Sequence, residues 1–478
     1  MAGGAAAVAT FISAVKQRAA DIIYIIEPKV IGPGIAFSSL DDDILCNTSV
    51  GIMSIVYDQQ NDFLEYLKEC GIDATRDSYV SRSLVGKYLN RKFLHYRDIA
   101  RKNGVKVFQI HDEFKSLKRI GHCKYIINFC NPLTQKINVT DVIFCTGYGK
   151  PKLPNVLIPY REIDTLVCCP YPEKDMLKRV KYLSRILVIG SKLSAVDSAI
   201  LLGREGHEVT MISPSGELAS VRSRFIRINK NIEFKNLMKI MTEWDLREKN
   251  CVFWTPKHAF LRFVLRTLST ETLSSWKLQF SFLNNYKDIL KEEIFIAKNG
   301  NALWQDLLAD FAFAINEFYI NNNSSDLPKE IKEIIHRYIT GLALPNAKKI
   351  LMLIDAKKLH VRKGTLKHVH LNPSWSVDWG EGVEQFDAIV LATGFYLPSF
   401  ILNLNNELEI DTEEKNKTSA IKITNLLSIK HPDWNENESI WFVGPPAHTR
   451  IPLPNAMFII VSIAEQVISG IKRLTAFR

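Results

Sequence analysis

One stretch of the sequence has the residue types and spacing that hold a dinucleotide by its phosphates. In residues 185–213 an apolar run ends at Gly190, a helical pattern follows, and a second apolar run ends at Ser213. Strand, glycine turn, helix and strand make the βαβ unit whose helix N-terminus accepts a pyrophosphate. We therefore expect the cofactor contacts of this unit to come from Gly190, Lys192 and Ser194.

Lys192 departs from the usual G-x-G-x-x-G/A pattern, because it stands where the second glycine belongs, while Ala195 keeps the third small position. That second glycine normally lets backbone approach phosphate closely. The lysine either turns outward or reaches the phosphates with its ammonium group. A positive group beside a diphosphate at a helix N-terminus is favourable, so we expect the phosphate contact. A βαβ unit that binds nothing remains the alternative for this segment alone.

A second, incomplete unit of the same kind lies at the start of the sequence. A helical run begins among the small residues Gly4 and Ala7, and a strand at 22–26 ends in Glu27. An acid about twenty residues after a glycine turn usually accepts hydrogen bonds from the ribose of an adenine dinucleotide. Ala2 replaces the first glycine, and no apolar strand precedes it. Either the natural protein begins upstream, or the domain lacks its central strand; a plain helix–strand piece is the simpler alternative.

Three later strands each end at a glycine, where we expect the backbone to pass close to another group. Two apolar strands, within 141–147 and 386–394, each run into Thr-Gly. A late strand within 439–444 ends in another glycine before a closing helix. The cofactor-binding candidates in these strands are Gly147, Gly394 and Gly444.

The alternation of strands and helices predicts an α/β protein with two Rossmann-like dinucleotide-binding domains. The pattern between 231 and 345 is helical and too long for a loop, which indicates a helical insertion. The predicted first domain comprises residues 1–165 and 386–478, and the second comprises 180–230 and 346–385.

The composition excludes several classes of protein. With 46% hydrophobic and 23% charged residues, the 478-residue chain resembles ordinary globular proteins. Its net charge of +10 suits anionic ligands, but no basic stripe with interleaved aromatics indicates nucleic-acid binding. The eight cysteines lack framework spacing and read as free thiols. We expect a cytoplasmic protein, without a membrane span, whose oligomeric state the sequence leaves open.

The order of these motifs resembles the two-dinucleotide-binding flavoproteins, in which one Rossmann domain holds FAD and a second, inserted in it, holds NAD(P)H. Within that class the chain is most similar to the bacterial FAD/NAD(P)-binding proteins related to flavin-dependent N-monooxygenases of amino acids and amines. The segments that carry the resemblance are 32–37, 45–47, 62–67, 79–82 with 88–89, 190–197 and 392–395.

The resemblance implies an FAD site in the first domain. Its pyrophosphate and ribose contacts would come from Gly4, Ala7 and Glu27. Ordinary roles remain open for the residues assigned to the flavin: a surface ion pair for the arginine, a turn cap for the asparagine, a loop position for the histidine. The candidates at the flavin are Asn47, Arg82, His448 and Gly444 with the helix from Asn455.

The end of the 185–213 unit favours NADPH over NADH. Sites specific for NAD place an Asp or Glu after the second strand, where it would repel a 2′-phosphate. Here Ser213 holds that place, with Ser215 close by and Arg222 and Arg224 following. Hydroxyl donors and a guanidinium suit a phosphate monoester. We expect one of the two arginines to bind the 2′-phosphate.

The cysteine spacing bears on the reaction. A flavin disulfide reductase needs two cysteines against the flavin, as C-x-x-C or C-x₄-C, and the chain has neither; the adjacent Cys168 and Cys169 lie in a linker. A monooxygenase needs no protein nucleophile. The resemblance implies N-hydroxylation of a small amino acid or amine by molecular oxygen through a C4a-hydroperoxyflavin, in specialised metabolism. The alternatives are a flavin oxidoreductase without oxygen insertion and a degenerate flavoprotein with a binding role.

Overall fold

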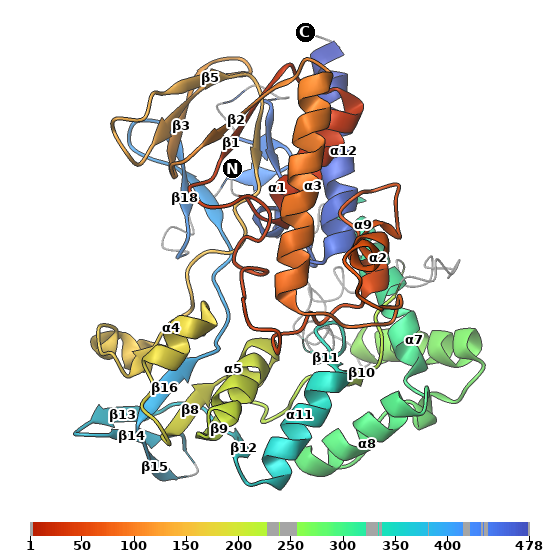
Figure 1. Cartoon of the computed structure of the whole chain (residues 1–478), viewed down its shortest axis with the longest axis vertical. Coiled ribbons are helices and arrows are strands. Elements are labelled where there is room, and N and C mark those ends of the chain that lie inside the picture. Colours follow the sequence, from red (N-terminus) through yellow and green to blue (C-terminus); the bar gives the residue numbers. More distant parts are fainter. Residues whose placement is uncertain are drawn as a thin grey trace.

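The computed structural model describes most of the chain. Its described residues are 3–226, 256–321, 337–380, 382–413, 421–431 and 438–476, together with Lys239, Glu333 and Trp434. Figure 1 shows two domains, one above the other, with the amino-terminal end of helix α3 (Arg82–Lys102) directed at the lower one.

The lower domain is built on one parallel sheet of five strands. Apolar side chains cover both faces, as parallel sheets require: Ile186 and Val188 pack towards helices, whereas Leu187 packs against a small antiparallel sheet. The helices of the first face are α5 (Leu193–Arg204) and α11 (Leu344–Asp355). In spatial order the parallel strands are β12 (Leu359–Lys363), β9 (Glu208–Ser213), β8 (Arg185–Ile189), β16 (Ala388–Leu391) and β7 (Leu166–Val167). The antiparallel strands are β13 (His368–Leu371), β14 (Trp375–Asp378) and β15 (Val383–Phe386).

The position of β16 corrects the predicted division of the chain. The sequence prediction assigned everything from residue 386 to the first domain, but β16 pairs with β8 and β7 in the lower sheet. The return to the first domain therefore comes after residue 391 rather than at 386. Strand β7 joins the same sheet from a stretch that was predicted as the linker between the two domains.

The upper domain has no such continuous sheet among its described residues. Strand β1 (Ile22–Ile26) pairs in parallel with β2 (Lys106–Ile110), and β6 (Val142–Phe144) pairs in parallel with β21 (Ile440–Phe442). No described strand joins these two pairs.

Helices hold the upper domain together instead. Helix α1 (Ala5–Gln17) packs against both α3 and α12 (Met457–Ala476), and nine of its residues are buried (Figure 1). An antiparallel sheet lies beside them and contains the hairpin of residues 124–139. Its strands, in spatial order, are β17 (Ser399–Leu402), β18 (Glu407–Asp411), β3 (Phe114–Gly121), β4 (Lys124–Phe129) and β5 (Ile137–Val139).

The predicted insertion at 231–345 is mainly helical where the structure describes it, and it ends in the short strand β11 (Leu342–Ala343). Helix α9 packs its apolar side chains into the core of the lower domain, and residues 227–238 and 322–332 lie outside the description. Across the described residues, no helix combines the length and the hydropathy that crossing a membrane requires. The remaining helices and short strands are α2 (Asp62–Glu69), α4 (Glu173–Lys178), α7 (Pro256–Thr272), α8 (Tyr286–Lys298), α9 (Leu308–Asn321), β10 (Val221–Arg222), β11 (Leu342–Ala343), β19 (Lys422–Ile423) and β20 (Ile429–Lys430).

The chain passes between the domains twice, and the two connections are hydrogen-bonded to each other. The Gly149 N–H donates to the Tyr396 carbonyl at 2.8 Å, and the Lys152 N–H donates to the Gly394 carbonyl at 2.9 Å. The Thr393 hydroxyl adds a bond to the Lys152 carbonyl at 2.5 Å. Both Thr-Gly motifs therefore lead into one double connection between the domains.

Candidate functional site

The first glycine turn lies at the N-terminus of α1, and Glu27 reaches it as predicted. The Gly3 N–H donates to Glu27 Oε2 at 2.6 Å, and a Cβ on Gly3 would lie 2.5 Å from Glu27 Cγ. Gly4 is the N-cap of α1, and the first turn has no acidic residue, which leaves its N–H groups open to an anion. The N-terminus of α1 and the carboxylate of Glu27 therefore lie together, and their contacts with phosphate and ribose stay predictions.

A second glycine loop, at 32–37, closes over this turn. The Gly32 N–H donates to the Gly3 carbonyl at 2.6 Å, and a Cβ on Gly34, at φ +53°, would lie 2.9 Å from Gly4 Cα. Helix α3 presses on the other side, where Asn90 Nδ2 donates to the Ile31 carbonyl at 2.7 Å. In the sequence, only the resemblance to known flavoproteins pointed to this loop. Its contact with the first turn becomes apparent only in the three-dimensional structure.

Two further glycines were predicted to contact the cofactor: Gly147, which faces open space, and Gly444, which borders the same turn. Gly147, at φ +72°, has no atom within 4 Å of where a Cβ would stand. A Cβ on Gly444, at φ +75°, would meet Ala6 Cβ at 3.3 Å, in the first turn of α1 beside Ala7. The residues present thus fit a dinucleotide: free helix N–H groups, an acid, and glycine backbone that makes room.

The residues predicted at the flavin lie in different places. Arg82 is buried at the start of α3 in an ion pair with Asp197 of α5, so the ion-pair interpretation holds for it, although the pair is buried rather than at the surface. The Asn47 carbonyl accepts from the Arg222 guanidinium across the domain boundary. A ring nitrogen of His448, Nδ1, lies 3.1 Å from the Pro445 carbonyl in the turn after β21. These contacts do not test whether Asn47 and His448 act at the flavin, so that role stays a proposal.

The second glycine turn, after β8, is built tightly into the lower sheet. The Gly190 N–H donates to the Ile212 carbonyl at 2.8 Å, and a Cβ on Gly190, at φ +128°, would lie 2.5 Å from the Ala392 carbonyl oxygen. Gly394, two residues further along the same chain segment, has φ +81° and no atom within 4 Å of a Cβ position. Only glycine fits at position 190 without moving β16.

Hydroxyl groups line the start of α5. Ser191 Oγ lies 2.8 Å from Ser213 Oγ and donates to the Glu217 carbonyl at 2.7 Å. Ser213 Oγ also accepts from the Gly216 N–H at 3.0 Å, so this predicted residue shapes the loop after β9 from a buried position. Ser194 stands in the first turn of α5, and its side chain lies near the Tyr171 hydroxyl.

Lys192 is the N-cap residue of α5, and its side chain lies along the segment after β9. Its Nζ donates to the Glu217 carbonyl at 3.1 Å and to the Leu218 carbonyl at 3.5 Å. Burial lowers the pKa of this ammonium group, with the charge of Glu217 acting in the opposite direction. Its contact with a cofactor phosphate stays a prediction.

The structure does not support the role predicted for Arg222 and Arg224. Arg222 is fully buried and donates to the carbonyls of Asn47 and Ile339, while its guanidinium lies 4.2 Å from the Phe225 ring centre. Arg224 donates to Asp306 at 2.7 Å from its Nε. Strand β10 directs Arg222 into the domain boundary, and Arg224, which follows the strand, is paired with Asp306, so neither is free at the end of β9.

A basic residue that the sequence analysis missed stands where those arginines were expected. Lys363, at the end of β12, is in register with Ser213. A Cβ on Gly216 would lie 2.9 Å from Lys363 Cβ, and Ser215 and Lys363 are both exposed. The basic residues at the end of β12 were the only signal in the sequence. The helical region separates β12 from its parallel partner β9, so no short-range pattern shows that the two strands pair.

With this geometry in place, comparisons with known proteins become informative. Residues 2–149 match the model of a family described as FAD-NAD(P)-binding. This part of the chain is an FAD-NAD(P)-binding domain. The predicted FAD and nicotinamide cofactors agree with that match. A comparison of the sequence with curated proteins gives no match.

The fold comparison extends over the whole chain. L-lysine 6-monooxygenase from Pseudomonas syringae is 12% identical, with a TM-score of 0.53 over 98% of this chain and 97% of that chain. Ornithine hydroxylase from Pseudomonas aeruginosa gives the same identity, score and coverage. The FAD-NAD(P)-binding domain therefore stands within the fold of the two-dinucleotide-binding flavoproteins, as predicted.

Proposed function

We propose that this protein is an NADPH-dependent flavin monooxygenase that N-hydroxylates a small amino acid or amine. The observation that carries the proposal is the combination of two glycine turns, one in each domain, with a fold shared along nearly the whole chain. The two solved structures of that fold are named for lysine and ornithine hydroxylation. Both turns offer helix N-termini of the kind that bind pyrophosphate.

The cysteines support oxygen transfer over disulfide reduction. Seven cysteines within the described residues are free thiols, and the spacing of all eight lacks the pair that a flavin disulfide reductase uses. Burial raises the pKa of Cys46, close to the domain boundary, to about 12. A thiol of that kind is not a nucleophile near neutral pH, since the reactive form is the thiolate.

Bound FAD supplies the redox and oxygen-transfer chemistry. The chain's own contribution is to hold and orient: the first turn of α1 and Glu27 bind the phosphates and ribose of one nucleotide, and the first turn of α5 binds those of the other. The closely packed glycines at 32, 34 and 190 bring backbone against the ligands.

For the nicotinamide cofactor we propose that Lys363 and Ser215 bind the 2′-phosphate. Both stand at the carboxyl end of the sheet, where ligands of open α/β sheets bind. The nearest acid after β9, Glu217, is paired with Arg337 at 2.8 Å, which reduces its repulsion of a phosphate. An ammonium and a hydroxyl donor together suit a phosphate monoester.

The reaction is tested by incubating the FAD-loaded protein with NADPH, oxygen and a panel of lysine, ornithine and linear diamines. We expect one of these to give a hydroxylamine in proportion to the NADPH and oxygen consumed. Peroxide as the sole oxygen product with every amine would indicate an oxidoreductase without oxygen insertion. A purified protein that takes up no flavin would indicate a binding role.

The assignment of the 2′-phosphate is tested by Lys363→Ala. The variant should raise the KM for NADPH about tenfold, equivalent to ~1.4 kcal/mol, and leave the KM for NADH nearly unchanged. Arg362→Ala is the matched control, because it removes an equal charge from the adjacent position, which alternates to the other face of β12. Equal effects on the two cofactors, or equal effects of the two variants, would refute the assignment.

A further inference from the structure

A buried ion pair joins the two nucleotide-binding domains. Arg82 is the first residue of α3 in the upper domain, and Asp197 lies on α5 in the lower one. Arg82 Nη2 donates to Asp197 Oδ2 at 2.8 Å. Tyr171, in the segment that leads into the lower domain, donates its hydroxyl to the same carboxylate oxygen at 2.7 Å. Three side chains from three segments therefore share one buried contact.

The surroundings of this contact differ from those of the other ion pairs across the boundary. The Asp197 and Arg82 side chains are 5% and 16% exposed. Burial raises the pKa of Asp197, while the positive charge of Arg82 and the Tyr171 hydroxyl oppose that rise. Further cross-boundary pairs, which join Arg204 and Lys349 to Asp41 and Asp43 and Arg224 to Asp77, are at least partly open to solvent. Solvent and salt screen such pairs, whereas a buried pair is screened much less.

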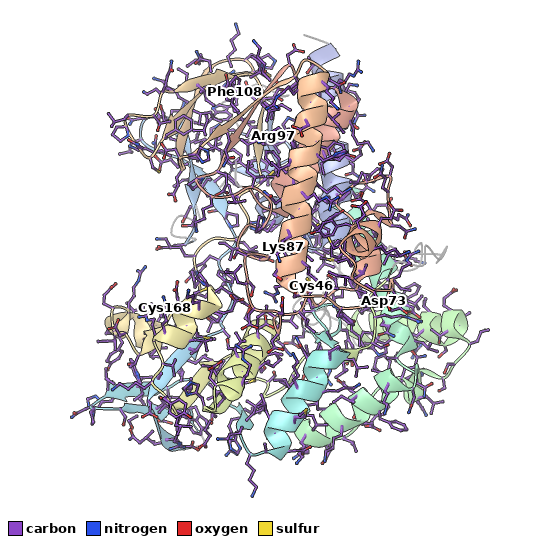
Figure 2. The ribbon with its side chains drawn as sticks, in the orientation of Figure 1. Cys46, Asp73, Lys87, Arg97, Phe108 and Cys168 are labelled. Atoms are coloured by element: carbon purple, nitrogen blue, oxygen red, sulfur yellow. The ribbon has the colours of Figure 1, made fainter. Side chains whose placement is uncertain are left out.

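The buried contact also reaches the start of α5 on the lower side and the loop before Asn47 on the upper side. On the lower side, Asp197 lies one turn beyond Ser194 on α5, and the Tyr171 hydroxyl lies near the Ser194 side chain. On the upper side, the Arg82 N–H donates to the Ile44 carbonyl at 2.9 Å, and the Cys46 N–H donates to the Val80 carbonyl at 2.8 Å. These bonds fix the loop before Asn47 against the start of α3. Figure 2 shows Cys46 at the lower end of α3, where the two domains meet.

The double connection at 147–152 and 394–396 is a second link between the domains, and it is made of loop segments with glycines at positive φ. Loop residues of this kind absorb rotations of one domain against another. A rigid relative orientation therefore needs a further contact elsewhere on the boundary. The Arg82–Asp197–Tyr171 contact has the burial and the geometry to provide it.

We propose that Arg82, Asp197 and Tyr171 act as a clamp of positioning residues that holds the two domains in the orientation in which NADPH reduces the flavin. The proposal rests on the FAD and NADPH part of the proposed function and is independent of the amine hydroxylation. The clamp acts on the rate of flavin reduction rather than on the binding of either cofactor, because its side chains join the domains and form neither nucleotide turn.

The test is anaerobic stopped-flow reduction of the FAD-loaded protein across NADPH concentrations. The main variant is the double substitution Arg82→Met with Asp197→Leu, which replaces both charges by apolar groups and leaves neither one buried alone. Its limiting rate of flavin reduction should fall at least tenfold, equal to ~1.4 kcal/mol on the barrier, while the Kd for NADPH and the FAD content stay close to wild type. Arg204→Gln, which removes a cross-boundary cation that is 40% exposed, should leave the limiting rate unchanged.

A wild-type limiting rate in the double variant would overturn the clamp. Should that variant fail to fold, Tyr171→Phe decides the question, since it keeps the ion pair and removes one hydroxyl. It should lower the limiting rate without changing the Kd, and an unchanged rate would likewise overturn the proposal. A wild-type protein whose bound flavin NADPH does not reduce would instead contradict the proposed function itself.

Discussion

The two nucleotide-binding units, one in the lower domain and one in the upper, each place a glycine turn at a helix N-terminus, but different contacts fix the two turns. In the lower unit a continuous parallel sheet places Gly190 between β9 and β16, so that strand pairing fixes the start of α5. In the upper unit the described parallel strands form two separate pairs, and the start of α1 is fixed by Glu27, by the loop at 32–37 and by the flanking helices. The difference shows that helix and loop packing position a phosphate turn when the surrounding sheet is not continuous.

This comparison has an energetic consequence. A turn fixed by a sheet retains its shape without ligand, because the backbone hydrogen bonds of several strands would have to break to move it. A turn fixed by an acid and by glycine contacts gains more from a bound nucleotide, which stabilises the folded form by mass action. We therefore expect the upper unit to depend on FAD more strongly than the lower unit depends on NADPH.

The largest expected effect comes from Glu27→Ala in the upper unit. The substitution removes the acceptor for the ribose and the partner of the Gly3 N–H. The loss of charge-assisted bonds of ~1.5–3 kcal/mol should weaken FAD binding about ten- to a hundredfold, as measured by fluorescence titration of the apoprotein. Glu27→Gln, which keeps an acceptor without the charge, should lose less. Undiminished FAD affinity in the alanine variant would contradict the assignment of this turn.

Gly190→Ala and Gly147→Ala compare how much stability a Cβ costs at a glycine packed in the lower sheet and at one in the upper domain that faces open space. Alanine at 190 places its Cβ against the Ala392 carbonyl within the sheet and should lower the free energy of unfolding by about 1–3 kcal/mol, as overpacking does. It should also abolish most NADPH binding. Alanine at 147 meets no protein atom and should cost stability only through its positive φ, about 1 kcal/mol. Urea unfolding of both variants measures this difference, and a larger loss at 147 would reverse it.

The smallest expected effect comes from Lys192→Gly, which gives the lower unit the glycine that the upper unit has at Gly4. Removing a cation beside the start of α5 should weaken NADPH binding by ~0.3–1 kcal/mol, less than about fivefold. The loss should shrink at high salt, because salt screens the interaction. Tighter NADPH binding by the glycine variant would show that Lys192 obstructs the turn.

Local patterns in the sequence were sufficient to predict much of the fold. The apolar runs around Gly190 predicted β8, α5 and β9, and the spacing to Glu27 predicted an acid at the first turn. Such elements follow from periodicity and turn chemistry over short stretches. The resemblance then supplied the two-domain architecture, which periodicity alone does not contain.

What the sequence did not reveal depends on contacts between distant segments. The assignment of β16 to the first domain was wrong because its partner strand, β8, lies on the far side of the helical region. Arg222 was placed at the nucleotide because it follows Ser213 closely, yet β10 directs it into the boundary between domains. Lys363 was overlooked for the same reason, since its register with Ser213 comes from parallel pairing of β12 with β9. Parallel pairing across long connections leaves no short-range pattern.

The separateness of the two nucleotide sites is tested most directly by titrating NADPH into the FAD-free Glu27→Ala variant by calorimetry. The lower unit has its own sheet and its own turn, so the variant should bind NADPH with the same Kd as the FAD-free wild-type protein. A Kd for NADPH that rises together with that for FAD would contradict the account, because it would mean that one site serves both nucleotides.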